Sequence, residues 1–171
     1  MTVVEEIVRL LPAEGKVVLF CPPAMAAQVH EACATDAQLV VLTDASKLSK
    51  AYQRLGDLPV VQSDLEKIPL APRSVDCVVA VDVLSRTATP LETLAPLCKL
   101  LHDGGRLVVA ERLMRSPTLR VLRRVTAPGS RRLLPEDVCA ALLNADMGAI
   151  RQTWPQGYPE RVVTHGRLKV I

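Results

Sequence analysis

The chain has 171 residues, a length that suits a single domain with a full hydrophobic core. Hydrophobic residues make up 49% of it, which excludes a disordered chain, and aromatic residues only 2%, which argues against a surface that stacks single-stranded nucleic acid. The formal net charge of +3 is too small to indicate an anionic partner by itself.

The cysteines and the N-terminus indicate the cellular compartment of the protein rather than a catalytic or metal-binding role. Five cysteines without CxxC spacing are typical of buried free thiols in a reducing cytosol, and they offer no close ligand pair for zinc. They are Cys21, Cys33, Cys77, Cys98 and Cys139. The N-terminus lacks the basic head and apolar run of a secretory signal, and no apolar run reaches membrane-spanning length. We therefore expect a cytoplasmic protein with no bound metal and no membrane span.

The N-terminal segment predicts a helix followed by a buried strand. Thr2 and Glu5 have the spacing of a capping box. The apolar face of this helix is expected to consist of Val4, Ile7, Val8 and Leu11. A strand is expected at residues 17–20, where every side chain is apolar, as in a central strand of a parallel sheet.

The rest of the chain alternates between predicted helices and strands. Further strands are expected at 39–42, 59–62, 75–81, 106–111, 149–153 and 161–170. Helices are expected at 24–34, 47–55, 91–101 and 116–125 and from 134 onward.

Asp44 or Ser46 is a candidate cap for the helix at 47–55, and Thr89 and Glu92 form a second candidate capping box. Pro96 should kink the helix at 91–101. A turn is expected at 103–105, and the alternation as a whole predicts βαβ units.

Five segments carry a family resemblance through their order and spacing. They are VVLTD at 40–44, VVQSD at 60–64, SVDCVV at 74–79, LLHDGGRLV at 100–108 and LPED at 134–137. Together they resemble the class I S-adenosylmethionine (SAM)-dependent methyltransferases of the small-molecule type. The resemblance implies an α/β, Rossmann-like, mostly parallel seven-stranded sheet with helices on both faces. The resemblance covers roughly residues 17–147, and together with the chain length it leads us to expect one minimal domain over residues 1–171, without a sizeable lid.

The resemblance implies roles for acidic residues that follow the strands. Asp44 matches the acid that binds both ribose hydroxyls of SAM, for which a carboxylate is well suited. Asp64 matches the residue that contacts the adenine, and Asp82 lies where the methyl group meets its acceptor. The adjacent residues Ala45 and Leu65 belong to the same implied cofactor site. Asp44 as a helix cap and Asp64 as a turn residue remain alternative interpretations.

The loop after the first strand departs from the family pattern. Where the family has an acid and three glycines, this chain has Leu19, Cys21, Pro23 and Met25. A leucine cannot replace the acid that faces the methionine end of SAM, and side chains stand where bare backbone would approach the ligand. Pro22 and Pro23 also remove two N–H donors. If Cys21, Pro22 and Pro23 form this part of the cofactor site, SAM is predicted to bind weakly or not at all.

A second distinctive feature is a cluster of arginines between residues 112 and 132. Its members are Arg112, Arg115, Arg120, Arg123, Arg124, Arg131 and Arg132. Arg120, Arg123 and Arg124 would share one face of the helix at 116–125. One interpretation is a solvated basic helix, and the other is a docking patch for an acidic protein, a nucleic acid or a phosphorylated ligand. The scarcity of aromatic residues favours a protein over a nucleic acid.

These features lead to three functional hypotheses. The first is a methyltransferase-like domain that is non-catalytic or strongly impaired and acts by binding a partner. The second is an active methyltransferase that holds SAM through Asp44 and Asp64 with a remodelled loop. The third is a domain that binds a different small ligand. No catalytic residue is predicted, since methyl transfer depends mainly on alignment of the two reactants.

Overall fold

The computed structural model describes residues 1–65, 67–87, 89–113, 133–155 and 161–170. The strands in these residues are β1 (Lys16–Phe20), β2 (Gln38–Thr43), β3 (Val60–Gln62), β4 (Val75–Val81), β5 (Leu101–Arg112), β6 (Met147–Thr153) and β7 (Arg161–Leu168). They form one seven-stranded sheet with the order β3-β2-β1-β4-β5-β7-β6. β1 to β5 pair in parallel, whereas β7 runs antiparallel to both β5 and β6. The predicted mostly parallel sheet is confirmed.

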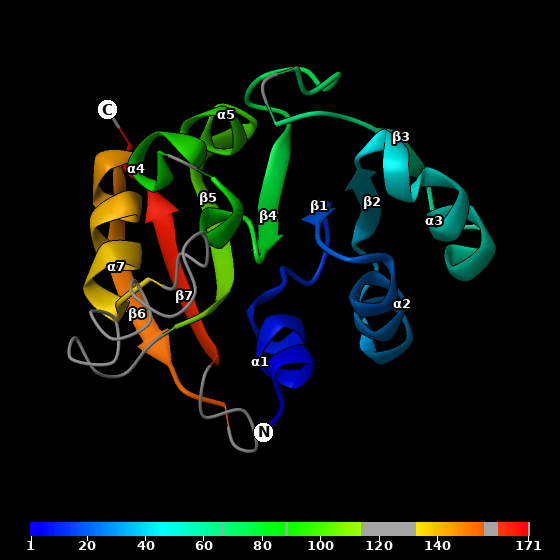
Figure 1. Cartoon of the computed structure of the whole chain (residues 1–171), viewed down its shortest axis with the longest axis horizontal. Helices are drawn as coiled ribbons and strands as arrows, with labels where there is room; N and C mark the ends of the chain where they lie inside the picture. Colours follow the sequence, from blue (N-terminus) through cyan, green and yellow to red (C-terminus); the bar gives the residue numbers. More distant parts are fainter. Residues whose placement is uncertain (66, 88, 114–132, 156–160, 171) are drawn as a thin grey trace, which may run out of the picture.

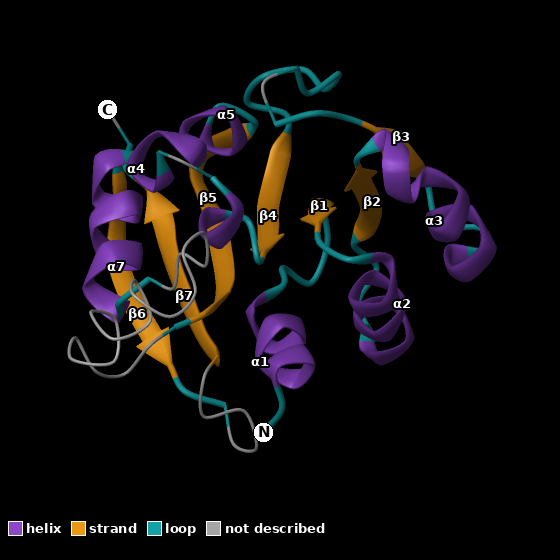
Figure 2. Cartoon of the chain, viewed as in Figure 1, coloured by secondary structure: helices purple, strands orange, loops and turns teal. Residues whose placement is uncertain are grey.

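Helices cover both faces of the sheet (Figure 2). The α-helices are α1 (Val3–Leu10), α2 (Pro23–Ala32), α3 (Leu48–Leu55), α4 (Pro90–Thr93), α5 (Ala95–Cys98) and α7 (Pro135–Asn144), and the two 3₁₀ turns are η1 (Ala45–Lys47) and η2 (Leu84–Arg86). Side chains of α1, α2 and α3 belong to one hydrophobic core, and those of α5 and α7 to the other. In Figure 1, α7 lies beside β6 at one end of the sheet and α3 beside β3 at the other.

Alternation along the central strands divides the aliphatic residues between these two cores. In β4, Val78 belongs to the core that contains Leu97 and Leu142, whereas Val79 belongs to the core on the opposite face that contains Ile7 and Val29. Every residue of β4 except Asp76 is buried, as the sequence predicted for a strand covered on both sides. The bounds of β4 agree with the prediction of residues 75–81.

The α1 helix confirms its predicted cap and part of its predicted face, since Ile7 and Leu11 are buried as expected. The Glu5 backbone N–H donates to Thr2 Oγ1 (3.1 Å), and the Thr2 N–H donates to the Glu5 carboxylate (2.8 Å), so the capping box is present. The buried residues of the helix are Val3, Glu6, Ile7 and Leu10, whereas Val4 and Val8 are only half-buried. Glu6 tolerates full burial because the Arg9 guanidinium makes two hydrogen bonds to it, at 2.7 and 2.9 Å.

The segment between β4 and β5 differs from its prediction. The helix expected at 91–101 is two four-residue helices that meet at Leu94, because Pro96 cannot continue the first one and instead lies in the first turn of α5. The capping box predicted at Thr89 is wrong, since the Thr89 side chain makes no capping hydrogen bond.

The turn expected at 103–105 is an irregularity within β5. Val75 pairs with Leu101 and Cys77 with Arg106, so four intervening residues of β5 lie opposite one of β4. Gly104 has a positive φ of 78°, which accommodates the bend.

The C-terminal part of the described chain follows its prediction. The buried residues of α7 include Val138, Ala141 and Leu142, and Ala145 directly after it is buried as well. β6 and β7 are antiparallel neighbours, which confirms the predicted pairing of the last two strands. The helix predicted at 116–125 lies outside the described residues. Within the described part of the chain, no helix combines the length and hydrophobicity needed to cross a membrane.

Candidate ligand pocket at the carboxyl ends of β1 and β2

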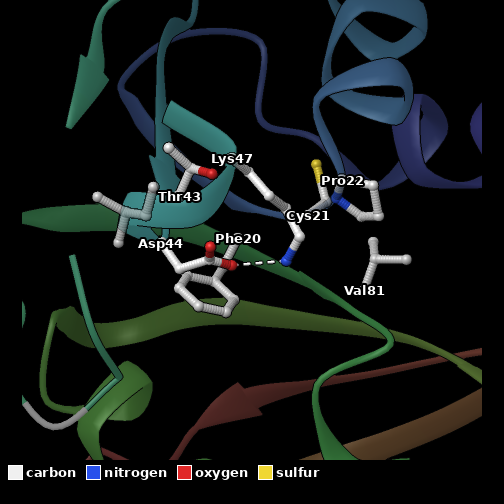
Figure 3. A pocket seen from close by; sticks show the side chains of 8 residues that line it. Phe20, Cys21, Pro22, Thr43, Asp44, Lys47 and Val81 are labelled. Atoms are coloured by element: carbon white, nitrogen blue, oxygen red, sulfur yellow. Dashed lines mark hydrogen bonds and ion pairs between the residues drawn. The ribbon is translucent and has the colours of Figure 1, made fainter. Parts of the chain in front are cut away.

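A pocket lies where β1, β2 and β4 end, which is the crevice where open α/β sheets usually bind ligands (Figure 3). Its lining residues are Phe20, Cys21, Pro22, Leu42, Thr43, Asp44, Lys47 and Val81. The hollow measures about 270 Å³ with the open solvent at its mouth included. Because this figure includes open solvent, the enclosed part of the pocket is smaller than the roughly 300–1,000 Å³ that small-molecule sites commonly occupy, which is small for a nucleoside.

The loop after β1 lines one wall of the pocket with Cys21 and Pro22 (Figure 3). Cys21 is 8% exposed, and burial raises the pKa of its thiol to about 12, so the thiol is protonated and neutral at pH 7. Pro23 is buried in the first turn of α2, and Met25 packs against the core beneath that helix; neither lines the pocket. Leu19, at the position of the family's acid, is fully buried.

Asp44 stands at the opposite wall, directly after β2. Its carboxylate accepts a hydrogen bond from Ser46 Oγ and contacts the Lys47 ammonium group at 2.5 Å. The hydrogen bond from Lys47, followed by that from Ser46, holds the pKa of the Asp44 carboxyl below its usual value. The predicted capping of the next helix is wrong, because α3 begins after Lys47 with no side-chain cap, and η1 intervenes.

The other predicted cofactor residues do not line this pocket. Asp64 is exposed beyond β3, where its backbone carbonyl accepts the Lys67 N–H at 3.0 Å. Leu65 is half-buried against one of the cores. Ala45 opens η1.

Asp82 belongs to a separate cluster at the end of β4. Its backbone has a positive φ of 53°, and its carboxylate forms an ion pair of 2.8 Å with Arg161, the first residue of β7. Glu111 of β5 is fully buried nearby and accepts the Leu84 backbone N–H at 2.7 Å. Within the described ranges, the buried side-chain atoms without a hydrogen-bond partner are Asp82 Oδ1, Glu111 Oε2 and Arg161 Nη1.

Glu111 was not among the residues predicted from the sequence to have a functional role. Burial raises the pKa of its carboxyl, and the hydrogen bond from Leu84 only partly offsets this. The available signal was an acid directly after the apolar run of residues 107–110, at the end of a strand expected to be covered on both faces. A charged residue in such a strand is costly unless it has a structural or functional role.

The arginine cluster is largely outside the described chain. Arg120, Arg123 and Arg124 lie in the segment 114–132, which the structure does not describe, whereas Arg112 is exposed at the end of β5. The described residues contain no group of three or more His, Cys, Asp or Glu side chains that could hold a metal ion.

Comparison with known proteins identifies the family. A family model described as "Methyltransferase domain" matches residues 21–109, just over half of the 171 residues. The chain belongs to this methyltransferase family. The family assignment agrees with the resemblance carried by the strand-end motifs and with the doubly wound sheet.

Relatives of this methyltransferase-family chain differ in length. It is 30% identical over 105 residues to an uncharacterised 37.1 kDa protein in transposon Tn4556 of Streptomyces fradiae. That match covers 58% of this chain but only 30% of the transposon protein. The chain therefore spans less than a third of the curated relative it matches.

Solved structures share the fold at low identity. The CurJ carbon methyltransferase matches with a TM-score of 0.75 and 16% identity, over 98% of this chain and 52% of CurJ. A complex of a methyltransferase with the Trm112 methyltransferase activator of Haloferax volcanii matches with a TM-score of 0.74 and 15% identity, over 97% of this chain and 88% of the matched chain. These similarities establish the class I methyltransferase fold.

Proposed function

We propose that this methyltransferase-family chain binds SAM weakly or not at all, and that it acts by binding a partner rather than by transferring methyl groups. The observation that carries the proposal is the loop after β1. Cys21, at one of the positions where the family resemblance implies glycine, and the adjacent Pro22 line the pocket wall. A ligand seated there meets a neutral thiol and a pyrrolidine ring instead of backbone N–H donors.

The residues present fit only part of SAM. Asp44 lies on the pocket wall, where a carboxylate can accept two ribose hydroxyls. Leu19, at the position of the family's acid, is buried in the core, and among the described residues that line the pocket the one acid is Asp44, so the cationic amino group of SAM lacks its counter-charge there. Each polar ligand group left without its partner costs about 1–3 kcal/mol, so two or three such losses would turn a micromolar ligand into a millimolar one.

Isothermal titration with SAM and with its demethylated product S-adenosylhomocysteine (SAH) tests this proposal. We expect no binding below about 1 mM for either nucleoside, because the loop withholds backbone donors and the counter-charge is missing. A dissociation constant of a few micromolar for either ligand would refute the proposal.

An active methyltransferase with a remodelled loop is the alternative function, and the position of Asp44 favours it. Its carboxylate faces the pocket from the end of β2, as the cofactor acid of the family resemblance would. On this alternative, Asp44 would keep its cofactor role, whereas Asp64 is exposed and outside the pocket. The titration distinguishes the two functions directly.

The proposal also covers the binding partner, the domain organisation and the cellular compartment of the chain. Arginines of the segment 112–132 are proposed to bind an acidic protein partner, on the strength of their density alone. The fold match to a methyltransferase in complex with the Trm112 activator offers a precedent for protein partners among similar folds. We further propose that residues 1–171 form one domain, since a single sheet runs from β3 to β6, and that five unpaired thiols suit the cytoplasm.

A further inference from the structure

The Lys47 side chain extends from η1 over the pocket to the Asp44 carboxylate (Figure 3). Its Nζ atom is 2.5 Å from Asp44 Oδ2, and the other carboxylate oxygen accepts the Ser46 hydroxyl. Both carboxylate oxygens of Asp44 are therefore already occupied, one by the Ser46 hydroxyl and the other by the Lys47 ammonium group. A ribose with two free hydroxyls needs these same oxygens.

Lys47 also determines the charge of the pocket. Among the eight lining residues, Asp44 and Lys47 are the charged ones, and the Cys21 thiol is neutral at pH 7. When a ribose displaces the ammonium group from Asp44, that ammonium remains at the pocket wall without its counter-ion. A ligand that is itself cationic then experiences repulsion that a neutral ligand of the same shape does not.

We propose that Lys47 is an internal competitor of the ribose hydroxyls: its ammonium group occupies Asp44 and makes the pocket select against a cationic nucleoside such as SAM. This inference rests on the proposed weak binding of SAM and names a residue that contributes to it. The competition affects every ribonucleoside alike. The charge repulsion affects SAM, which carries a sulfonium, more than SAH or adenosine.

The test measures dissociation constants of K47M for adenosine, SAH and SAM by ligand-observed NMR. Methionine keeps an unbranched side chain close in size to the aliphatic part of lysine and removes the ammonium group. Both side chains of the ion pair are more than a third exposed (38% and 40%), so the pair is weak and the gain modest. We expect about threefold tighter binding of adenosine and SAH, and about tenfold tighter binding of SAM, where repulsion is also relieved.

Three control variants make the test specific. K47R keeps the cation and the ion pair and should bind all three nucleosides as the wild type does. K50M removes an exposed charge one turn further along α3, away from the pocket, and should change nothing. The double variant D44N/K47M should lose the gain, because the carboxylate that the ribose needs is gone.

The outcomes separate this inference from the proposed function. Unchanged dissociation constants in K47M, or an equal gain in K50M, would overturn the role of Lys47 and leave weak SAM binding in place. Weaker binding in K47M would show that Lys47 holds the ligand and would also overturn it. Micromolar binding of SAM by the wild type would refute the proposed function, whatever the variants do.

Discussion

At the scale of single residues, Glu111 is a buried carboxyl group that is only partly hydrogen-bonded. It is fully buried, one of its oxygens accepts the Leu84 N–H, and the other has no partner among the described residues. Burial raises the pKa of this carboxyl above its ordinary value of 4.5. Over the pH range between the ordinary pKa of the unfolded chain and the higher pKa of the folded chain, the folded chain therefore holds a proton that the unfolded chain has already released. In this range the free energy of unfolding falls as the pH rises.

Glu111→Gln is expected to remove this dependence. A neutral amide keeps the shape and the acceptor for Leu84 without the cost of a buried charge, so the variant should be at least as stable as the wild type at pH 8. Urea unfolding from pH 5 to pH 8 checks this: the wild type should lose stability with rising pH, and the variant should lose less.

Two further variants complete that experiment. Glu111→Ala leaves the Leu84 N–H without its acceptor and should cost about 1–3 kcal/mol at every pH. Glu31→Gln, at an exposed position on α2, should behave as the wild type. A variant E111Q with the same pH dependence as the wild type would show that Glu111 is ionised without penalty.

At the scale of elements, Asp76 connects the amino ends of β1, β4 and β5. One of its oxygens accepts the Lys16 backbone N–H at 2.8 Å, and the other contacts His102 Nε2 at 2.7 Å. The Lys16 hydrogen bond is the main reason that the pKa of Asp76 lies below its usual value. Gly15 precedes this contact with a φ of 103°, and a Cβ atom there would lie 2.4 Å from Asp76 Oδ2.

Gly15→Ala should therefore destabilise the start of β1. The alanine must adopt an unfavourable left-handed backbone and also displace a carboxylate that two hydrogen bonds hold in place. We expect a loss of at least about 2 kcal/mol in the free energy of unfolding, measured by urea denaturation.

Gly56→Ala is the matched control, because Gly56 also has a positive φ, of 54°, but a Cβ atom added there would meet no other atom within 4 Å. It should cost about 1–3 kcal/mol from the backbone alone, because a φ of 54° with a ψ of −117° lies in a region that residues with a side chain rarely adopt. Equal losses in the two variants would mean that the contact with Asp76 contributes nothing.

At the scale of the whole molecule, the sheet order explains how distant segments form one edge. β1 and β4 are direct neighbours although 54 residues separate Phe20 from Val75, so the loop after β1 and the end of β4 share a pocket. The arginine segment leaves the sheet from β5, which is the next strand along. Of this segment the structure describes Arg112, which ends β5, so a partner that contacts Arg112 would lie beside the carboxyl edge of the sheet.

The arginine prediction belongs to this scale. The triple variant R120A/R123A/R124A should elute from a polyglutamate resin at lower salt than the wild type, because attraction between exposed charges is screened by salt. Thermal unfolding of the variant should be unchanged if these side chains serve binding.

A second triple variant, K50A/R54A/K99A, removes the same charge from exposed positions elsewhere in the described chain. It should elute nearly as the wild type does. Identical elution of both triple variants would show that net charge, rather than the arginine segment, determines retention.

The sequence by itself determined what depends on local pattern. Nearly continuous apolar runs identified β4 to the residue and β1 to within one residue, because a strand covered on both faces has few polar positions. Capping chemistry located the start of α1, and helical spacing the buried face of α7. The strand-end motifs also indicated the family, and Asp44 as the acid that faces the pocket.

Tertiary structure decided what depends on contacts between distant residues. The ion pair of Arg161 with Asp82 joins residues that are 79 positions apart in sequence, and the hydrogen bond of Leu84 with Glu111 joins residues that are 27 positions apart. Both interactions form only because β4, β5 and β7 are neighbours in the sheet. The hydrophobic pattern alone also did not predict that Glu6 of α1 is buried, since its burial depends on the ion pair with Arg9. Asp44 and Lys47 are only three residues apart, but the direction of their side chains into the pocket was not evident from that spacing.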